Sequence, residues 1–122
     1  MSQAIMVVDD SPSVRQLMGF SLTNANYRVV EASNGQEALE LFDKEDVSMV
    51  ITDLNMPKMD GLQLIKELRG GRACRFMPIV LLTSESEQEN RQRSKDVGAS
   101  AWLNKPFKPT QLLQMVRMVL PH

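Results

Sequence analysis

The chain has 122 residues, of which 43% are hydrophobic, and its 14 basic and 15 acidic side chains almost balance. That size suits one domain with a substantial core, and so small a net charge argues against a nucleic-acid-binding or membrane-surface protein. No apolar stretch approaches the roughly 18 residues of a membrane span, no secretory signal pattern is present, and the single cysteine, Cys74, excludes an internal disulfide. We therefore expect one cytoplasmic domain over residues 1–122.

Apolar runs and helical patterns alternate from the first residues onward. Ala4–Val8 is a short β-type run, and Ser11 followed by Pro12 predicts the start of a helix. The inner face of that helix is expected to carry Val14, Leu17, Met18, Ser21, Leu22 and Ala25. A second strand follows at 28–31, and Asn34 with Glu37 predicts a capping box. The inner side of the helix after it is expected to hold Ala38, Leu39, Leu41 and Phe42.

The second half continues this alternation. A third strand is predicted at 49–52, and Gly61 opens a helix with Leu62, Ile65 and Leu68 inward. A fourth strand is predicted at 79–82, a very polar helix at about 87–97, and a fifth strand at 101–103. The core stripe of the last helix is expected to comprise Leu112, Leu113, Val116, Val119 and Leu120. Beside this stripe, Met118 fits either an exposed partner-binding position or a gap-filling position at the core edge.

Five apolar strands that alternate with helices indicate an α/β domain, in which helices cover both faces of a parallel sheet. Ligands of such sheets bind beyond the carboxyl ends of the strands. The first strand ends at Asp9 and Asp10, the third at Asp53 and the fourth at Thr83, and Lys105 follows the fifth. The sequence therefore predicts that three carboxylates, a hydroxyl group and an ammonium group lie at one edge of the sheet.

Three carboxylates at one edge favour a site for a hard divalent cation. Two charges about 4 Å apart repel by roughly 4 kcal/mol at an effective dielectric constant near 20, and a cation removes this repulsion. Oxygen ligands without cysteine or histidine favour Mg²⁺, or Mn²⁺, over zinc. The alternative is purely local: Asp9 and Asp10 cap the first helix, and Asp53 begins a turn.

Thr83 and Lys105 supply groups that a metal site alone does not need. A hydroxyl group and a fixed cation facing a carboxylate would bind phosphate oxygens. An aspartate can also act as a nucleophile and carry a phosphoryl group as an acyl phosphate. Taken singly, Lys105 also fits a surface lysine, and Thr83 fits a hydroxyl group satisfied by the backbone.

Four segments, VVDDSPSVRQLM, ITDLNMPKMDG, LLTSES and AWLNKPF, resemble in order and spacing the receiver domains of two-component response regulators. The resemblance covers essentially the whole chain and is greatest to the stand-alone, CheY-like chemotaxis regulators, which have no output domain. It implies a single doubly wound (βα)5 domain with a parallel sheet of order 2-1-3-4-5, the flavodoxin-like or CheY-like fold. It also implies a signalling module that catalyses its own phosphorylation and dephosphorylation, not a metabolic enzyme.

The resemblance assigns roles at the sheet edge. Asp53 would be the phosphoacceptor. Asp10 and Asp53 would bind Mg²⁺ through their carboxylates, Asp9 would support the ion through water, and Asn55 would contribute its backbone carbonyl. After transfer, Lys105 would pair with the phosphate.

Further positions are implied to act as a switch or to tune the phosphate lifetime. Thr83 would bond a phosphoryl oxygen, and Trp102 stands where receivers usually carry a Tyr or Phe that rotates inward. The larger indole ring and its N–H argue against a full inward swing, and the alternative is a tryptophan that only packs. Asn55 and Glu85 occupy the positions that tune hydrolysis of the acyl phosphate, and this polar pair predicts fairly quick dephosphorylation. The Lys105–Pro106 peptide bond is expected to be cis.

The phosphoryl group has to come from another molecule, because the only histidine is His122, the last residue. The resemblance implies a CheA-like sensor histidine kinase, or a small acyl phosphate, as the donor. It also implies a readout surface formed by the fourth helix, the fifth strand and the last helix. A flagellar motor switch protein or a phosphatase is the further partner expected of a chemotaxis regulator, and the chain is expected to be a monomer that binds neither nucleic acid nor membrane.

Three other functions share part of this pattern. A phosphorelay intermediate or phosphate sink shares the chemistry but has no output target. A haloacid-dehalogenase-type phosphatase needs a second aspartate two residues after the nucleophile, where this chain has Asn55. A flavodoxin-like electron carrier would not place Asp9 and Asp10 against a flavin phosphate. The sequence identifies neither the kinase, the stimulus nor the target.

Overall fold

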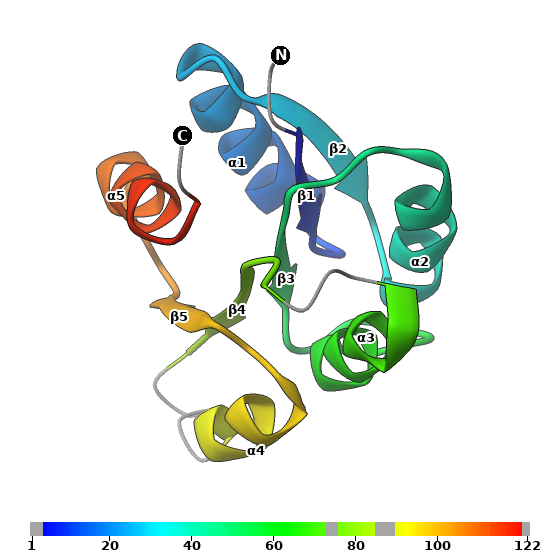
Figure 1. Cartoon of the computed structure of the whole chain (residues 1–122). Coiled ribbons are helices and arrows are strands. Elements are labelled where there is room, and N and C mark those ends of the chain that lie inside the picture. Colours follow the sequence, from blue (N-terminus) through cyan, green and yellow to red (C-terminus); the bar gives the residue numbers. More distant parts are fainter. Residues whose placement is uncertain (1–3, 73–75, 85–89, 121–122) are drawn as a thin grey trace.

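A parallel β-sheet forms the centre of the protein (Figure 1). The structure is a computed structural model and describes residues 4–72, 76–84 and 90–120. Its strands are β1 (Ala4–Val8), β2 (Arg28–Ala32), β3 (Met49–Asp53), β4 (Ile79–Thr83) and β5 (Ala101–Asn104). They pair in parallel in the order β2-β1-β3-β4-β5, which confirms the doubly wound α/β fold predicted from the sequence.

Helices cover both faces of this sheet. On one face lie α1 (Pro12–Asn24) and α5 (Pro109–Val119), and on the other lie α2 (Gly35–Lys44), α3 (Gly61–Glu67) and α4 (Asn90–Val97) (Figure 1). A π-helical segment, η1 (Leu68–Arg72), continues α3. Within the described ranges, no helix is long and apolar enough to cross a membrane. Residues 87–89, the first turn of the predicted polar helix, lie outside the described residues.

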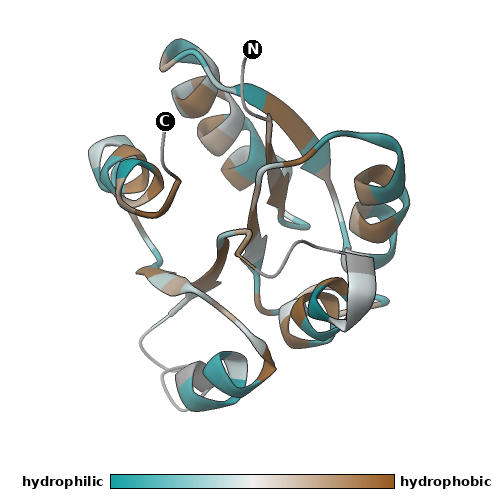
Figure 2. Ribbon diagram, in the orientation of Figure 1, coloured by the Kyte–Doolittle hydropathy of each residue, from teal (hydrophilic) through white to brown (hydrophobic). Residues whose placement is uncertain are grey.

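The two faces of each central strand belong to two different cores, since successive side chains point to opposite faces of a sheet. In β1, Met6 and Val8 pack in the core beneath α2 and α3, whereas Ile5 and Val7 pack in the core beneath α1 and α5. All four side chains are fully buried. This two-sided burial explains why the strands are continuous apolar runs, and Figure 2 shows the hydrophobic sides of the helices turned toward them.

The helices begin at the predicted caps, with one change. The Ser11 hydroxyl accepts a hydrogen bond from the N–H of Val14 at 3.4 Å, and Asn34 Oδ1 accepts one from the N–H of Glu37 at 2.8 Å. The returning bond of the capping box goes elsewhere than predicted, because Glu37 Oε1 accepts from the N–H of Ser33, at 2.9 Å. The cap at the start of α2 therefore involves the residue before Asn34 as well.

Some inner faces differ from the predicted ones. Leu17 was predicted to face inward but is 41% exposed. The sheet and α5 cover only a narrow side of α1, centred on Leu22, and the apolar stripe predicted from helical spacing is wider than that side. In α3, Leu64 is fully buried, whereas the predicted Leu62 is only half-buried at the core edge. Met118 is 78% exposed, so it occupies the exposed position and not the gap-filling position at the core edge.

Candidate functional site

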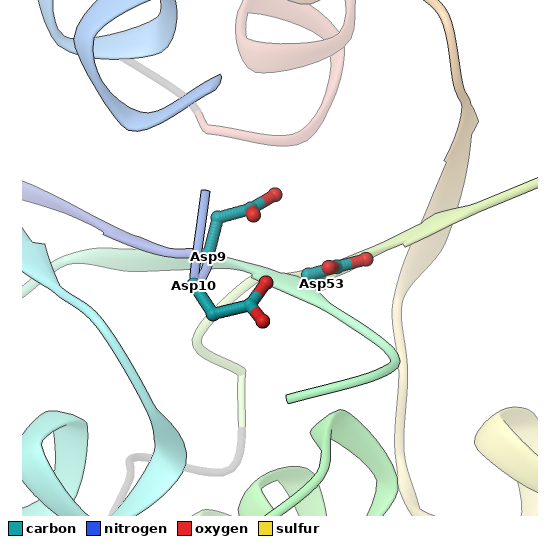
Figure 3. A group of neighbouring side chains, drawn as sticks. All are labelled: Asp9, Asp10 and Asp53. Atoms are coloured by element: carbon teal, nitrogen blue, oxygen red, sulfur yellow. The ribbon is translucent and has the colours of Figure 1, made fainter. Parts of the chain in front are cut away.

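The carboxyl ends of β1 and β3 bring three carboxylates together. Val8 pairs with Thr52 in parallel register, so the residues that follow them, Asp9 and Asp53, lie side by side. Asp10 follows in the β1–α1 loop, and one carboxylate oxygen from each aspartate lies within 4.8 Å of the others. Figure 3 shows the three carboxylates directed into the same space at the edge of the sheet.

These carboxylates differ in their surroundings. Asp9 is fully buried and Asp53 is 7% exposed, whereas Asp10 is exposed. Asp9 Oδ1 accepts a hydrogen bond from the N–H of Ser11 at 2.9 Å. Asp9 Oδ2 has no hydrogen-bond partner among the described residues and instead lies 3.1 Å from Lys105 Nζ in an ion pair. A buried carboxylate oxygen of this kind retains capacity for a further cation.

Lys105 closes the site from the side of β5. Its Nζ lies 3.0 Å from Asp53 Oδ1 and 3.1 Å from Asp9 Oδ2. The backbone N–H of Lys105 donates to the carbonyl oxygen of Thr83 at 2.7 Å, which ties the loop after β5 to the end of β4. The Lys105–Pro106 peptide bond is cis, as predicted. One ammonium group therefore faces two buried carboxylates.

Burial and charge shift the protonation of both partners. Burial raises the pKa of Asp53 above its usual 3.8, with a further contribution from Asp9 and against the hydrogen bond from Lys105. Burial alone would lower the pKa of Lys105, but the contact with Asp53 and the attraction of Asp53 and Asp9 outweigh burial and raise that pKa above 10.5. Lys105 is therefore charged at neutral pH, and three aspartates facing one ammonium group leave the edge negative.

Thr83 lies at this edge, but its hydroxyl group has a partner that the sequence did not reveal. The side chain is fully buried, and Oγ1 donates a hydrogen bond to Asn104 Oδ1 at 3.3 Å. β4 and β5 pair with Thr83 opposite Asn104, which brings the two side chains together. The partner of the Thr83 hydroxyl group is therefore a side chain and not the backbone group that the sequence allowed as an alternative.

The other residues predicted for the site are Asn55, Trp102 and Glu85. Asn55 is exposed in the loop after β3, two residues beyond Asp53. Trp102 is half-buried in β5 against the core beneath α2 and α3, and its indole Nε1 donates to the hydroxyl of Ser94 in α4 at 2.7 Å. Glu85 lies outside the described residues.

Two residues that support the site were not predicted from the sequence to do so. Arg15 Nη1 donates to the backbone carbonyl of Asp9 at 2.6 Å, and Arg15 Nε lies 3.6 Å from Glu31 Oε1, so this side chain ties the end of β1 to β2. At the start of α3, a side chain on Gly61 would overlap the backbone carbonyl oxygen of Asp53. The sequence could have indicated both residues, because Arg15 lies within the segment VVDDSPSVR and Gly61 lies within the segment ITDLNMPKMDG.

The residues at this edge fit a hard cation such as Mg²⁺. The donor set consists of carboxylate oxygens, which Mg²⁺ prefers. Asp9 Oδ2 is a buried oxygen with unused capacity, and the exposure of Asp10 leaves one side open to water and to phosphate. The residues that would hold the ion are Asp9, Asp10 and Asp53.

Comparison with known proteins identifies the same domain. Residues 5–117 match the response regulator receiver domain family. "Probable transcriptional regulator ycf27" of Porphyra purpurea is 41% identical over 118 residues, and the transcriptional regulatory protein SrrA of Staphylococcus aureus is 36% identical over 120 residues. These alignments cover 97% and 98% of this chain but 47% and 48% of the relatives, so the chain spans about half the length of the curated relatives it matches.

A solved structure agrees with this match. The chemotaxis protein CheY4 of Vibrio cholerae superimposes with a TM-score of 0.93 and 40% identity, over 98% of this chain and 100% of that one. Receiver domains are signalling modules that bind Mg²⁺ through acidic residues and receive their phosphoryl group from a histidine kinase. The family match over nearly the whole chain, the shared fold and the acidic cluster lead to one conclusion: this chain belongs to the response regulator receiver domain family.

Proposed function

We propose that this chain is a phosphorylation-dependent signalling switch whose phosphoacceptor is Asp53. The observation that carries the proposal is the setting of this carboxylate, which is buried, lies 3.0 Å from Lys105 Nζ and clusters with Asp9 and Asp10. A carboxylate that only starts a turn needs no such surroundings. Gathering three acidic groups at one edge also costs folding free energy, which a phosphate-transfer site explains.

Phosphoryl transfer would proceed by attack of a carboxylate oxygen of Asp53 on phosphorus. The new P–O bond forms while the bond from phosphorus to the donor breaks, and the bonding electron pair leaves with the donor's imidazole or carboxylate. The ionised form of Asp53 is the nucleophile. The Lys105 ammonium group, already 3.0 Å away, would pair with the phosphoryl oxygens as they approach.

The metal requirement follows from charge. Asp10 and Asp53 would hold Mg²⁺ through their carboxylates, Asn55 through its backbone carbonyl and Asp9 through water. When bound, Mg²⁺ would neutralise negative charge on the carboxylates and on the incoming phosphoryl oxygens. The clustering of the three aspartates within 4.8 Å supports this assignment.

The phosphorylated state would differ from the resting state at Thr83. A phosphoryl group adds a charge of about −1.5 to −2 and strong acceptor oxygens, so the Thr83 hydroxyl would turn from Asn104 to the phosphate. Trp102 would respond through β5. Asn55 and Glu85 would set the rate at which water hydrolyses the acyl phosphate.

The finer part of the proposal is a chemotaxis regulator that acts as a cytoplasmic monomer. It would receive phosphate from a CheA-like kinase, show the surface of α4, β5 and α5 to a flagellar motor switch protein, and be reset by a phosphatase. The match to CheY4 over that chain's full length supports this, and so does Met118, which is 78% exposed on α5.

A second candidate is the receiver of a transcriptional regulator. It is favoured by the curated relatives ycf27 and SrrA, which are about twice as long as this chain and are described as transcriptional regulators. Both candidates share the phosphorylation chemistry at Asp53 and differ only in the output. Phosphorylation-dependent binding to a motor switch protein would distinguish them in favour of chemotaxis.

Intact-protein mass spectrometry after incubation with acetyl phosphate and Mg²⁺ tests the shared chemistry. The expected result is one phosphoryl adduct in the wild type, which is lost in Asp53→Asn and when EDTA is added. The exposed Asp46→Asn variant is the control and should be phosphorylated like the wild type. An adduct that survives in Asp53→Asn, or its absence from the wild type, would overturn the proposal.

A further inference from the structure

A side-chain hydrogen bond ties the only tryptophan of the chain to a helix on the same face of the sheet. Trp102 lies in β5 and packs against the core beneath α2 and α3. Its indole Nε1 donates to Ser94 Oγ at 2.7 Å, and Ser94, in α4, has no exposed surface. The sequence contains one tryptophan, so this bond can be observed without interference from another indole.

The bond matters for α4 because this helix has few apolar side chains that could pack against the sheet. Its sequence, NRQRSKDV, contains a single aliphatic residue, Val97, which is only half-buried. A helix that cannot bury an apolar stripe is weakly attached. A fully buried serine that accepts a hydrogen bond from β5 therefore helps to hold α4 against the sheet.

The same strand connects Ser94 to the acceptor site. Asn104 lies two residues after Trp102 in β5, on the same face of the sheet, and it accepts the hydrogen bond from Thr83 Oγ1. The carbonyl of Thr83 in turn accepts from the N–H of Lys105, whose ammonium group contacts Asp53. Hydrogen bonds, an ion pair and the backbone of β5 thus connect Asp53 to Ser94.

We propose that Ser94 is a positioning residue that holds Trp102, and with it α4, in the unphosphorylated arrangement, and that this bond is released when Asp53 carries a phosphoryl group. The inference rests on the proposed function. Ser94 lies in α4 and accepts the hydrogen bond from the indole, so it acts through Trp102. Because the bond belongs to the resting state alone, its removal favours the activated state by about threefold to tenfold, the effect of one neutral hydrogen bond on an equilibrium.

The test compares Ser94→Ala with Ser21→Ala. Ser21 is the matched control because it is also a buried helical serine, but its hydroxyl donates to the backbone carbonyl of Leu17 in α1. Beryllium fluoride with Mg²⁺ serves as the phosphoryl mimic, and two properties are measured: the half-saturating beryllofluoride concentration by Trp102 fluorescence, and hydrogen exchange of the indole N–H by NMR.

The expected result has two parts. Without beryllofluoride, the indole N–H exchanges faster in Ser94→Ala than in the wild type, because its acceptor is gone. The half-saturating beryllofluoride concentration falls by about threefold to tenfold in Ser94→Ala and is unchanged in Ser21→Ala. In the wild type, saturating beryllofluoride itself speeds exchange of the indole N–H.

A second measurement does not depend on tryptophan fluorescence. Trp102→Phe removes the indole N–H but keeps an aromatic ring. The acetyl phosphate concentration needed for half-maximal phosphorylation is measured by intact mass for Trp102→Phe and for the double variant Trp102→Phe/Ser94→Ala. If the effect of Ser94 depends on its bond to Trp102, the two variants need the same concentration. Independent, additive effects of the two changes contradict the proposal.

The remaining outcomes separate this inference from the function on which it rests. A wild type that binds beryllofluoride, with Ser94→Ala binding equally well, overturns the role of Ser94 and leaves the phosphoacceptor intact. A wild type that binds no beryllofluoride overturns both.

Discussion

Asp53 is buried beside Asp9, and the Lys105 ammonium group contacts both carboxylates. One positive charge between two buried negative charges, with Asp10 close by, leaves an excess of negative charge. The pKa of Asp53 is raised mainly by burial, and the neighbouring Asp9 carboxylate raises it further, because both disfavour the ionised form. The same features make Asp53 a stronger base, and so a better nucleophile, than an exposed aspartate.

Asp53→Asn should raise the free energy of unfolding of the metal-free protein at pH 7, by on the order of 1 kcal/mol. At Asp53 the folded protein holds its proton to higher pH than the unfolded chain, so the contribution of this group to stability falls as pH rises from 3.8 through its raised folded pKa. The gain from Asp53→Asn should therefore be largest above the folded pKa and shrink as pH falls toward 3.8. Urea unfolding in EDTA across a pH series measures it.

The matched control for this series is Asp46→Asn, which changes an exposed carboxylate that precedes β3, whereas Asp53 ends that strand. It should leave stability nearly unchanged at every pH. A stability gain of Asp53→Asn that does not vary with pH, or a loss of stability, would contradict the electrostatic account.

Which residues form the site could be predicted from the sequence, but several of their partners could not. Asp9, Asp10, Asp53 and Lys105 follow predictable strands, and parallel strands end at one edge. The partner of the Thr83 hydroxyl lies 21 residues farther along the chain. Such pairs depend on strand register, which neither composition nor periodicity specifies.

At the level of elements, strands were easier to predict than helix faces. Both faces of β1 and β3 are buried, so their apolar runs leave little choice. The inner face of a helix depends on what its neighbours cover, which is why Leu17 is exposed and Leu64 is buried against expectation. The junction between β3 and α3 depends on the close approach of the two backbones, since Gly61 lies against the backbone of Asp53.

Gly61→Ala should lower the free energy of unfolding by about 1–3 kcal/mol, because the added methyl group would overlap the carbonyl oxygen of Asp53 and push α3 from its place. Gly70→Ala is the control, since a side chain there meets no atom within 4 Å. It should be neutral or slightly stabilising. Chemical denaturation of both variants measures the effect, and equal stabilities would mean that the β3–α3 junction is not tightly packed.

At the level of the whole molecule, folding is what builds the site. Residues 9, 53 and 105 are far apart in the chain, yet they meet because β1 and β3 are neighbours in the sheet and the loop after β5 reaches back to the end of β4. A ligand that binds only this assembled edge therefore stabilises the entire fold.

Mg²⁺ at ten times its dissociation constant should raise the free energy of unfolding of the wild type by about 1.4 kcal/mol. Asp10→Asn should lose most of this gain, yet unfold in EDTA much like the wild type, because Asp10 is exposed. Thermal unfolding with and without Mg²⁺ measures both effects. If Mg²⁺ stabilised Asp10→Asn as much as the wild type, the ion would not be bound at this edge.

The most direct test of the central claim is chemical location of the phosphoryl group. Borohydride reduces an acyl phosphate to an alcohol, which turns the modified aspartate into homoserine. Protein treated with acetyl phosphate and Mg²⁺ is reduced, digested and sequenced by tandem mass spectrometry. We predict homoserine at position 53 alone, and none in samples treated with EDTA. Homoserine at position 9 or 10 instead, or at no aspartate, would contradict the assignment of Asp53 as the phosphoacceptor.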